Sequence, residues 1–474
     1  MVGHTSLTRF GTNIAAPPTV LRSRPVLLLI LLLRDSAEYT SPRAVRQVKL
    51  PMETVTRMAG RFRPDRRGIA APAELLPFVT IAAGEALSGY KPGNTYDVAV
   101  IGAGVFGSWT AHHLQKAGKK VILIDGYGSA SARASSGGES RIIRMGYGGD
   151  EVYTRSSKRS LELWKEFFRR TSHPEFFQQT GVLWLSRSNN PQIAKTAEIL
   201  TKVGVKFENL SRSELEKRFP QFQLGLVASA VFEPGSGALL ARRAVQAVVA
   251  DFIRGGGHFL PEPVVTPTGK GAVKSVETRM GSKVSAGSFV FACGPWLPKV
   301  FPELLGRRIF PTRQEIFFFG VPAGDRRWSM PAMPAWIDVG DLYGFPNIEN
   351  RGFKIAHDTH GPSFDPDTGE RVVTTGQVTD MRNRMATLLP GLKDAPLVET
   401  RVCQYENSSN GDFLLDRHPE MKNVWLAGGG SGHGFKHGPT VGEYLAAQVL
   451  GTGNAPEPRF SLATKGTVQQ RAVY

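Results

Sequence analysis

The folded part of the chain opens on a short apolar run, which predicts a strand buried on both faces. Residues 98–101 are all apolar and lack the alternation that is typical of a strand with one face in water. Helical periodicity follows over 104–117, and a second apolar run over 121–124 ends at Asp125. The pattern therefore predicts the order strand, turn, helix, strand.

Later segments continue the alternation of helical and strand patterns. Amphipathic stretches predict helices over 153–170, 191–203, 211–219, 239–255 and 441–450. Strands are predicted over 181–186, 289–294 and 423–428, in a meander of three short strands between 258 and 288, and throughout the aromatic-rich region 313–355. Two of the apolar runs, 289–294 and 423–428, end in glycine, which is typical of strands that return to a buried parallel sheet.

Together these patterns predict an α/β fold built from two interleaved domains. We expect a discontinuous, Rossmann-like dinucleotide-binding domain over 95–178, 235–308 and 408–450. We expect the substrate domain and the tail over 179–234, 309–407 and 451–474, in an α+β arrangement with a large mixed or antiparallel sheet. A chain of 474 residues is long enough for two such cores.

The N-terminal segment does not share these patterns. We expect residues 1–94 to be a disordered leader or extension that the catalytic core does not need. The apolar run 26–33 is shorter than the roughly 20 residues that cross a bilayer, so we expect no membrane span. An arginine pair at 66–67 before the mostly apolar stretch 69–87 loosely resembles a twin-arginine export signal, although Pro72 interrupts it. We expect a cytoplasmic protein, with export through this leader as the alternative.

Charge and cysteine content narrow the classes of partner. The formal net charge is +17, which raises the question of nucleic acid. Residues 1–96 hold 13 Lys and Arg against 6 Asp and Glu, and the remaining excess is spread without a long basic run. We therefore expect no nucleic-acid partner, with a basic RNA-modifying enzyme as the alternative. Cys293 and Cys403 are too few for a disulfide framework or a Cys-rich metal site, so we expect no metal, and we expect Cys293 to be core.

The first predicted turn carries three glycines in the spacing of a dinucleotide-binding site. Gly102 allows a tight turn, Gly104 allows backbone N–H groups to approach a pyrophosphate, and Gly107 allows the helix to pack closely on the strand. The helix N-terminus favours the anion, and Asp125 lies where an acid binds ribose hydroxyls. A flavin or nicotinamide dinucleotide is therefore expected. The expected cradle residues are Gly102, Gly104, Val105, Phe106, Gly107 and Asp125.

A second glycine-rich turn, at 428–436, distinguishes between these two cofactors. It follows the predicted strand 423–428 and opens a helix. A helix N-terminus aimed at the pyrimidine edge of a flavin would stabilise the negative charge of the reduced ring. The turn therefore favours a flavin.

Three motifs carry a family resemblance. They are Ser135–Arg144, Cys403–Tyr405 followed by Asp412–Pro419, and Ser431–Lys436. In this order they resemble the monomeric sarcosine oxidase group of the D-amino-acid-oxidase-like flavoproteins, over about residues 96–450. That group also includes N-methyltryptophan, pipecolate and fructosyl-amino-acid oxidases.

The resemblance implies FAD as a covalently bound cofactor. Cys403 matches the cysteine that, in this family, forms a thioether to the flavin 8α-methyl group, and such a bond needs a thiolate that faces the flavin. Arg141 matches an arginine beside the flavin. The further residues that the resemblance assigns to FAD are Ser135, Ser136, Gly432, His433, Gly434, Phe435 and Lys436.

The same resemblance implies the residues that carry the chemistry. Lys436 and Arg144 match residues that hold the substrate carboxylate, for which an arginine fork is well suited. Lys354 matches a lysine that promotes the reaction with O2, because a fixed positive charge stabilises superoxide. Apart from the resemblance, Tyr343, Tyr147 and Trp336 are candidate pocket walls, with core or rim aromatics as the equal alternative.

The implied reaction is the oxidation of a secondary or N-substituted amino acid, with a neutral α-amine, to an imine, while O2 is reduced to H2O2. Sarcosine-like, N-methyl-amino-acid-like and pipecolate-like substrates remain open, and a monomer is expected. The alternatives are a flavin-dependent amino-acid dehydrogenase with another electron acceptor and a fructosyl-amino-acid oxidase. One departure is Gly137, where several sarcosine-type oxidases carry histidine, so a polar group near the flavin is missing.

Overall fold

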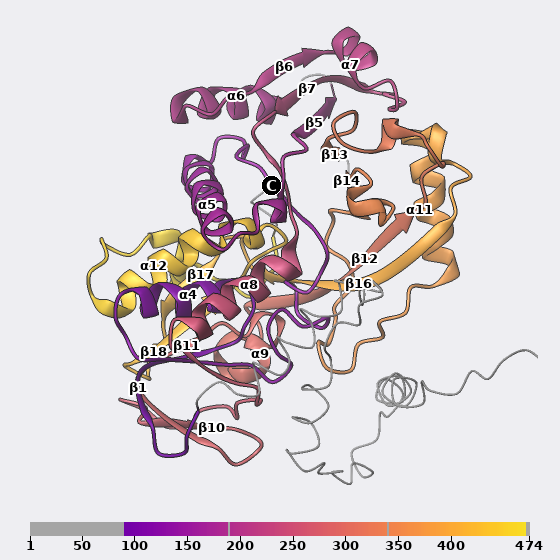
Figure 1. Cartoon of the computed structure of the whole chain (residues 1–474). Coiled ribbons are helices and arrows are strands. Elements are labelled where there is room, and N and C mark those ends of the chain that lie inside the picture. Colours follow the sequence, from indigo (N-terminus) through magenta and orange to yellow (C-terminus); the bar gives the residue numbers. More distant parts are fainter. Residues whose placement is uncertain (1–89, 188–189, 339–340, 471–474) are drawn as a thin grey trace, which may run out of the picture. The chain divides into compact units, whose positions relative to one another are not determined.

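Two large sheets organise the part of the chain that the structure, a computed structural model, describes: residues 90–187, 190–338 and 341–470 (Figure 1). The expectations for the leader over 1–94 concern residues that lie almost wholly outside this part. In the described ranges, no helix is long and apolar enough to cross a membrane.

The first sheet has seven strands and a parallel centre. Its order is β17 (Leu414–Arg417), β18 (Val424–Gly428), β11 (Lys283–Phe291), β1 (Thr95–Ile101), β2 (Val121–Ile124) and β9 (His258–Leu260), and β10 (Ser275–Glu277) pairs with β11. β11 pairs parallel with β1 on one side and with β18 on the other, and β2 pairs parallel with β1. Three segments that are far apart in the sequence therefore lie side by side (Figure 1).

Both faces of this sheet are buried, as the apolar runs predict. Val98 and Val100 of β1 belong to one core, whereas Ala99 and Ile101 belong to the core on the opposite face. The first core also receives residues of three helices, α4 (Val105–Lys116), α8 (Ala241–Arg254) and α12 (Gly438–Leu450). The alternation of neighbouring side chains between two apolar layers explains why β1 has no polar face.

The second sheet has eight strands and is mostly antiparallel. Its order is β16 (Leu397–Ser408), β12 (Ile309–Phe319), β15 (Phe353–His357), β14 (Leu342–Phe345), β13 (Ala335–Asp338), β5 (Val182–Arg187), β7 (Val227–Glu233) and β6 (Glu208–Ser211). β13 and β5 pair parallel, whereas the long strands β12 and β16 pair antiparallel over their length (Figure 1). A small third sheet contains β3 (Arg141–Ile143), β8 (Gly237–Leu239) and β4 (Phe177–Gln178). This architecture confirms the predicted α/β fold with a second, largely antiparallel sheet.

Side-chain caps set several helix boundaries. Asp150 accepts a hydrogen bond from the backbone N–H of Tyr153 (3.3 Å) at the start of α5 (Glu151–Arg170). Asn190 does the same for the N–H of Gln192 (2.9 Å) in α6 (Pro191–Val203), which ends at Gly204 with φ +70°. A capping box at Ser211 begins α7 (Arg212–Arg218). These polar residues satisfy N–H groups that have no partner within the helix, and each helix follows its sequence prediction closely.

The structure corrects the predicted meander between 258 and 288. β9 does not pair with its neighbours in sequence but lies parallel to β2 at the edge of the first sheet. The strands predicted at 283–288 and 289–294 form one strand, β11. One element that the periodicity did not predict is α11 (Thr375–Leu388), in which the buried apolar residues are Met381 and Met385, too few to mark a helical stripe.

The contact between α4 and α12 gives a test of the fold. A methyl group at Gly442 would lie 2.6 Å from the carbonyl carbon of Trp109 and 2.8 Å from the backbone nitrogen of Thr110. We expect Gly442→Ala to lower the free energy of unfolding by about 1–3 kcal/mol, because the two helices must separate. Urea unfolding measures this change.

Gly376 provides the matched control on the exposed side of α11, where the nearest atom to an added methyl group is 3.9 Å away. Gly376→Ala is expected to leave stability unchanged or to raise it by roughly 0.5–1 kcal/mol, because alanine loses less entropy in a helix than glycine does. Equal effects of the two substitutions would contradict the close packing of α4 on α12.

Candidate active site

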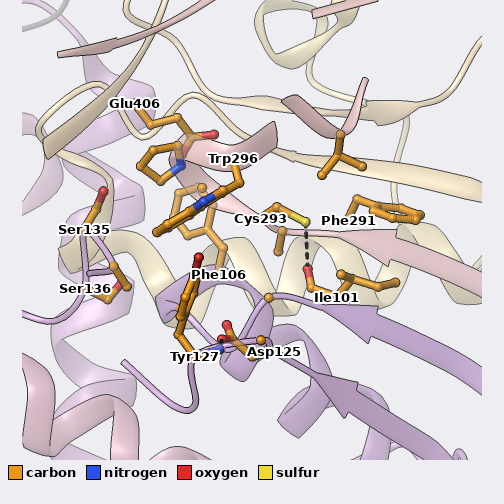
Figure 2. A pocket seen from close by; sticks show the side chains of 18 of the residues that line it. Ile101, Phe106, Asp125, Tyr127, Ser135, Ser136, Phe291, Cys293, Trp296 and Glu406 are labelled. Carbon is orange, nitrogen blue, oxygen red and sulfur yellow. Dashed lines mark hydrogen bonds between the residues drawn. The ribbon is translucent and has the colours of Figure 1, made fainter. Parts of the chain in front are cut away.

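A cavity of about 510 Å³ lies at the carboxyl ends of the parallel strands (Figure 2). Its walls include the ends of β1, β2, β11 and β18, and it extends to Cys403 on β16 and to Phe435. In Figure 2, Ser135 and Ser136 lie at one end of the view and Phe291 at the other, with Trp296 between them. Ligands of open α/β sheets bind at this edge, and the volume is within the range of about 300–1,000 Å³ that is common for cofactor sites.

The glycines of the first turn have the close contacts that their spacing predicts. Gly102 adopts φ +109°, and a Cβ there would overlap the carbonyl oxygen of Ala292. A Cβ at Gly107 would overlap the carbonyl oxygen of Gly102. The helix can therefore approach the strand this closely only because position 107 has no side chain. Gly102, Gly104, Val105 and Phe106 line the cavity, whereas Gly107 acts through packing.

Asp125 lines the cavity at the end of β2 and also supports this turn. Its Oδ2 accepts a hydrogen bond from the backbone N–H of Ala103 (2.7 Å), and its Oδ1 accepts one from the N–H of Tyr127 (2.8 Å). On the opposite side, Ser136 Oγ accepts from the N–H of Val105 (3.0 Å), the first residue of α4. Two side chains that are distant in sequence thereby fix the cradle.

A second, smaller pocket of about 70 Å³ adjoins the first cavity. The two share Arg141, Cys403, Tyr405, Gly432 and Phe435 as wall residues. The smaller pocket adds two apolar strand residues, Ile316 and Ile337, and the ring of Tyr343. Its further wall residues are Ile142, Arg144, Gln314, Phe345, Asp358, His433 and Lys436.

Arg141 and Cys403 meet at the boundary between the two spaces. The Arg141 guanidinium donates hydrogen bonds to the Ser135 carbonyl oxygen (2.6 Å) and to Cys403 Sγ (3.4 Å). Cys403 comes from the middle of β16, opposite Gln314 of β12. The structure therefore brings together Arg141 of the first sequence motif and Cys403 of the second.

Lys436 and Arg144 converge on one tyrosine behind the smaller pocket. Lys436 Nζ donates to Tyr147 Oη (2.7 Å) and to the carbonyl oxygen of His433 (3.0 Å). The Arg144 guanidinium lies 4.5 Å from the ring centroid of Tyr147 and 4.1 Å from that of Trp184, and it donates to the Gly146 carbonyl. The two cations thus share a wall of the pocket, as the resemblance implies, while Tyr147 lies behind them rather than on the wall.

Burial perturbs the ionisation of this cluster. Loss of solvation lowers the pKa of Lys436 well below its usual value, and the nearby Arg144 lowers it further, whereas Asp358 and Glu233 act in the opposite direction. Tyr147 Oη also contacts His437 Nε2 (2.8 Å), and His437 Nδ1 contacts Ser156 Oγ (2.9 Å) on α5. Burial likewise lowers the pKa of His437. A bound anion would favour the charged form of Lys436.

Glu233, which the sequence patterns did not single out, holds the backbone beside Arg144. Its carboxylate accepts hydrogen bonds from the N–H groups of Met145 (2.8 Å) and Gly146 (2.9 Å) and from Ser236 Oγ (2.6 Å). Glu233 is fully buried, and a buried carboxylate needs several donors; because burial is a property of the folded chain, no sequence pattern marked this residue.

Two further expected site residues lie elsewhere. Lys354 Nζ donates to the Ser140 carbonyl oxygen (2.9 Å) and lies 4.3 Å from the ring centroid of Phe345, beside a separate cavity of about 40 Å³. Burial lowers its pKa well below the usual value. Trp336 is not a pocket wall but is fully buried in the core of the second sheet, where its ring packs edge-on against Phe222.

Position 137 has no room for a side chain in this backbone. A Cβ at Gly137 would overlap the Ser131 carbonyl oxygen, and the Gly137 carbonyl accepts two hydrogen bonds from Arg242 (2.8 and 2.6 Å). The absence of the histidine that several sarcosine-type oxidases carry is therefore accompanied by a locally tight loop.

Cys293 packs against the apolar core of the first sheet, as expected, and it also borders the larger cavity. Its Sγ donates to the Ile101 carbonyl oxygen (3.6 Å; Figure 2). Burial raises the pKa of the thiol, and the carboxyl groups of Asp125 and Glu406 raise it further. This cysteine therefore stays protonated beside the cavity.

Glu406 is the second wall residue that sequence reasoning missed. It is 7% exposed, and its Oε1 accepts no hydrogen bond from the described residues. Burial raises the pKa of its carboxyl to about 8, although the N–H groups of Gly429 and Gly430 act against this shift. It lies three residues after Cys403 on β16, and a regular strand places such residues on opposite faces, so the strand pattern did not mark Glu406 as a wall residue.

Comparisons with known proteins agree on one family for this chain. Residues 97–448 match the family described as "FAD dependent oxidoreductase". The chain is 32% identical over 368 residues to a monomeric sarcosine oxidase from Arthrobacter sp. (strain TE1826), which covers 76% of this chain and 93% of that relative. It is 30% identical over 360 residues to the peroxisomal sarcosine oxidase of Homo sapiens, which covers 74% and 91%. An N-methyl-L-tryptophan oxidase from Citrobacter koseri is 28% identical over 77% of this chain and 97% of its own length.

Solved structures share the fold at lower identity. The L-proline dehydrogenase from P. horikoshii superposes with a TM-score of 0.67 at 23% identity, over 78% of this chain and 97% of that one. This likeness concerns the fold alone.

The raised pKa of Glu406 predicts a stability change with pH. The folded protein favours the neutral form of the Glu406 carboxyl. Its contribution to the free energy of unfolding is therefore fully present below the unfolded pKa near 4.5 and is lost as pH rises through about 8. Relative to the wild type, Glu406→Gln should gain stability across this window, by up to about 1.4 kcal/mol per pH unit. Urea unfolding between pH 4.5 and 9 measures the difference, and Glu303→Gln on the surface is the control. If the free energy of unfolding of Glu406→Gln and of the wild type changed with pH in parallel, the raised pKa of Glu406 would be refuted.

Proposed function

The chain belongs to the FAD dependent oxidoreductase family and is a sarcosine oxidase-like flavoprotein, and on this premise we propose that it oxidises a secondary or N-substituted amino acid. The observation that carries this proposal is the pair of buried cations, Arg144 and Lys436, in a small pocket that opens on the wall of the cofactor cavity. A carboxylate fits such a pair, because each cation donates charge-assisted hydrogen bonds. The names of the relatives support an N-substituted amino acid such as sarcosine, and a monomer as the working form.

The larger cavity fits FAD. It extends from a turn in which side chains at positions 102 and 107 would overlap backbone atoms to a second glycine-rich turn at 428–434. Between them, Glu406 has an oxygen without a hydrogen-bond donor among the described residues, and a polar ligand could satisfy it. In our proposal Gly102, Gly104, Val105, Phe106, Asp125, Ser135 and Ser136 bind the dinucleotide end, and Arg141, Gly432, His433, Gly434, Phe435 and Lys436 bind the flavin end.

The two domains would have different functions, one in cofactor binding and the other in substrate binding. We assign the cofactor to the domain that contains the seven-stranded sheet (95–178, 235–308 and 408–450). We assign the substrate walls to the domain that contains the eight-stranded sheet (179–234, 309–407 and 451–474). Since both cations come from the first of these domains and Tyr343 comes from the second, substrate would bind where they meet.

In the proposed mechanism, the residues of the chain bind and orient the amino acid. Arg144 and Lys436 hold the carboxylate, and Glu233 and Tyr147 fix these two cations through the contacts described above. The apolar walls exclude water from the carbon–nitrogen bond, which strengthens the electrostatic contacts inside the pocket. Bound FAD supplies the redox chemistry, accepting two electrons from the substrate and passing them to O2. Orientation of the substrate by two fixed cations contributes to the rate.

Lys354 is proposed to assist the reaction with O2. It is buried, and in its protonated form it would stabilise superoxide in an environment of low dielectric constant. Its Coulomb interactions with Arg141 and Cys403 support a position within reach of the flavin end of the cavity.

Cys403 is proposed to carry the flavin covalently, because it lies on the wall of the cofactor cavity beside the Arg141 guanidinium. Acid-precipitated wild-type protein should remain yellow and gain the mass of one FAD. Cys403→Ser should release all flavin into the supernatant, whereas Cys293→Ser, the other cysteine at the cavity, should keep it bound. Release of the flavin from wild-type protein would refute the attachment.

Removal of either cation should weaken substrate binding. We expect Lys436→Met and Arg144→Ala each to raise KM for a carboxylate substrate by roughly ten- to a hundredfold, because loss of one charge-assisted contact costs about 1.5–3 kcal/mol. Peroxide release with a panel of N-substituted amino acids measures this. Lys422→Met, an exposed lysine, controls for the change in net charge. Unchanged kinetics in both variants would place the substrate elsewhere.

A further inference from the structure

The walls of the smaller pocket include one acid besides several cations. Among the described residues that line it, the cations are Arg141, Arg144 and Lys436, and the one acid is Asp358. Asp358 directly follows β15 in the eight-stranded sheet, whereas Lys436 follows the glycine turn after β18 of the other sheet. Positive and negative charge therefore reach the pocket from different sheets.

The position of Asp358 is fixed by its neighbours. Its backbone N–H donates to the Asp341 carbonyl oxygen (2.6 Å), which closes the turn between β14 and β15. The hydroxyl of Tyr405, another wall residue, donates to Asp358 Oδ1 (3.5 Å). The carboxylate is half-buried, so water screens it less than it screens a surface acid.

The charge of Asp358 acts on the whole pocket. It raises the pKa of Lys436 against the stronger effect of burial, and it contributes to the raised pKa values of Tyr147 and Tyr343 on either side. A protonated amine that entered a pocket lined by three cations and no acid would be repelled. The negative charge of Asp358 reduces this repulsion.

We propose that Asp358 binds the positively charged amino group of the substrate, so that the pocket selects a zwitterion whose carboxylate contacts Arg144 and Lys436. This inference rests on the proposed function. The protonated amine is the form that an amino acid presents at neutral pH, and the neutral form that reacts arises only after a proton is lost. Asp358 therefore acts in binding and in selection against simple carboxylates, rather than in the oxidation itself.

Matched pairs of ligands test the charge directly. Trimethylglycine and 3,3-dimethylbutanoate have the same shape, but only the first carries a positive nitrogen; glycine and propanoate form a smaller pair of the same kind. Calorimetric titration of the flavin-loaded protein without O2 gives the four Kd values and requires no turnover. For at least one pair, we expect the wild type to bind the zwitterion at least about tenfold more tightly than the neutral isostere.

Variants of Asp358 test whether this residue causes the preference for zwitterions. In Asp358→Asn, the ratio of the Kd of the neutral isostere to the Kd of the zwitterion should fall about tenfold. The affinity for the neutral isostere should stay the same or improve. Asp358→Glu, which keeps the charge, should retain most of the preference, and Asp394→Asn on the surface should retain all of it.

Two outcomes would overturn the inference, and they are distinguishable. If the wild type binds the neutral isosteres as tightly as the zwitterions, or if Asp358→Asn keeps the preference, Asp358 does not select the amine although the carboxylate site stands. If none of the four ligands binds, or if Arg144→Ala leaves all four Kd values unchanged, the carboxylate site of the proposed function is wrong as well. The comparison within the wild type remains decisive even if a variant fails to fold.

Discussion

The parallel pairing of β11 between β1 and β18 is the constraint on which the site depends. It places the carboxyl ends of three distant segments at one edge of a sheet, and the glycine turns after β1 and β18 face the same cavity because of it. The backbone contact between Gly102 and Ala292, at the ends of β1 and β11, is possible only without a side chain. The cavity is thus a property of strand order, and its walls are supplied by side chains that follow each strand.

The chemistry of the site depends on keeping charges away from water. Arg144 is 5% exposed and Lys436 is 4% exposed, and both contact carbonyl oxygens and aromatic rings. Burial of these two positive charges costs solvation free energy. Glu233 reduces this cost indirectly, since it holds the loop beside Arg144.

The sequence predicts those parts of the protein whose signals are local. Apolar runs identify the strands of the first sheet, and glycine spacing identifies the cradle, because a turn and its contacts lie within a few residues of each other. The places of Trp336 and Cys293 could not be decided from the sequence, because a tryptophan or a cysteine in an apolar run fits a core and a cavity wall equally well and only tertiary packing decides. Glu233, Asp358 and Glu406 were missed for a similar reason: an isolated acid within or just after a strand has no periodic signature, and its neighbours come from other segments.

The order of the elements also bears on synthesis. Helix α4 is made early, yet α12, whose glycines at 438 and 442 fit against Val105 and Trp109, follows more than 300 residues later. At about 5–20 residues per second, the apolar face of α4 waits roughly 15 to 60 s for this partner on a translating ribosome. The cavity has no complete wall before then. Capture of the flavin is therefore a late event, and the apolar face of α4 needs shielding during elongation until α12 has been made.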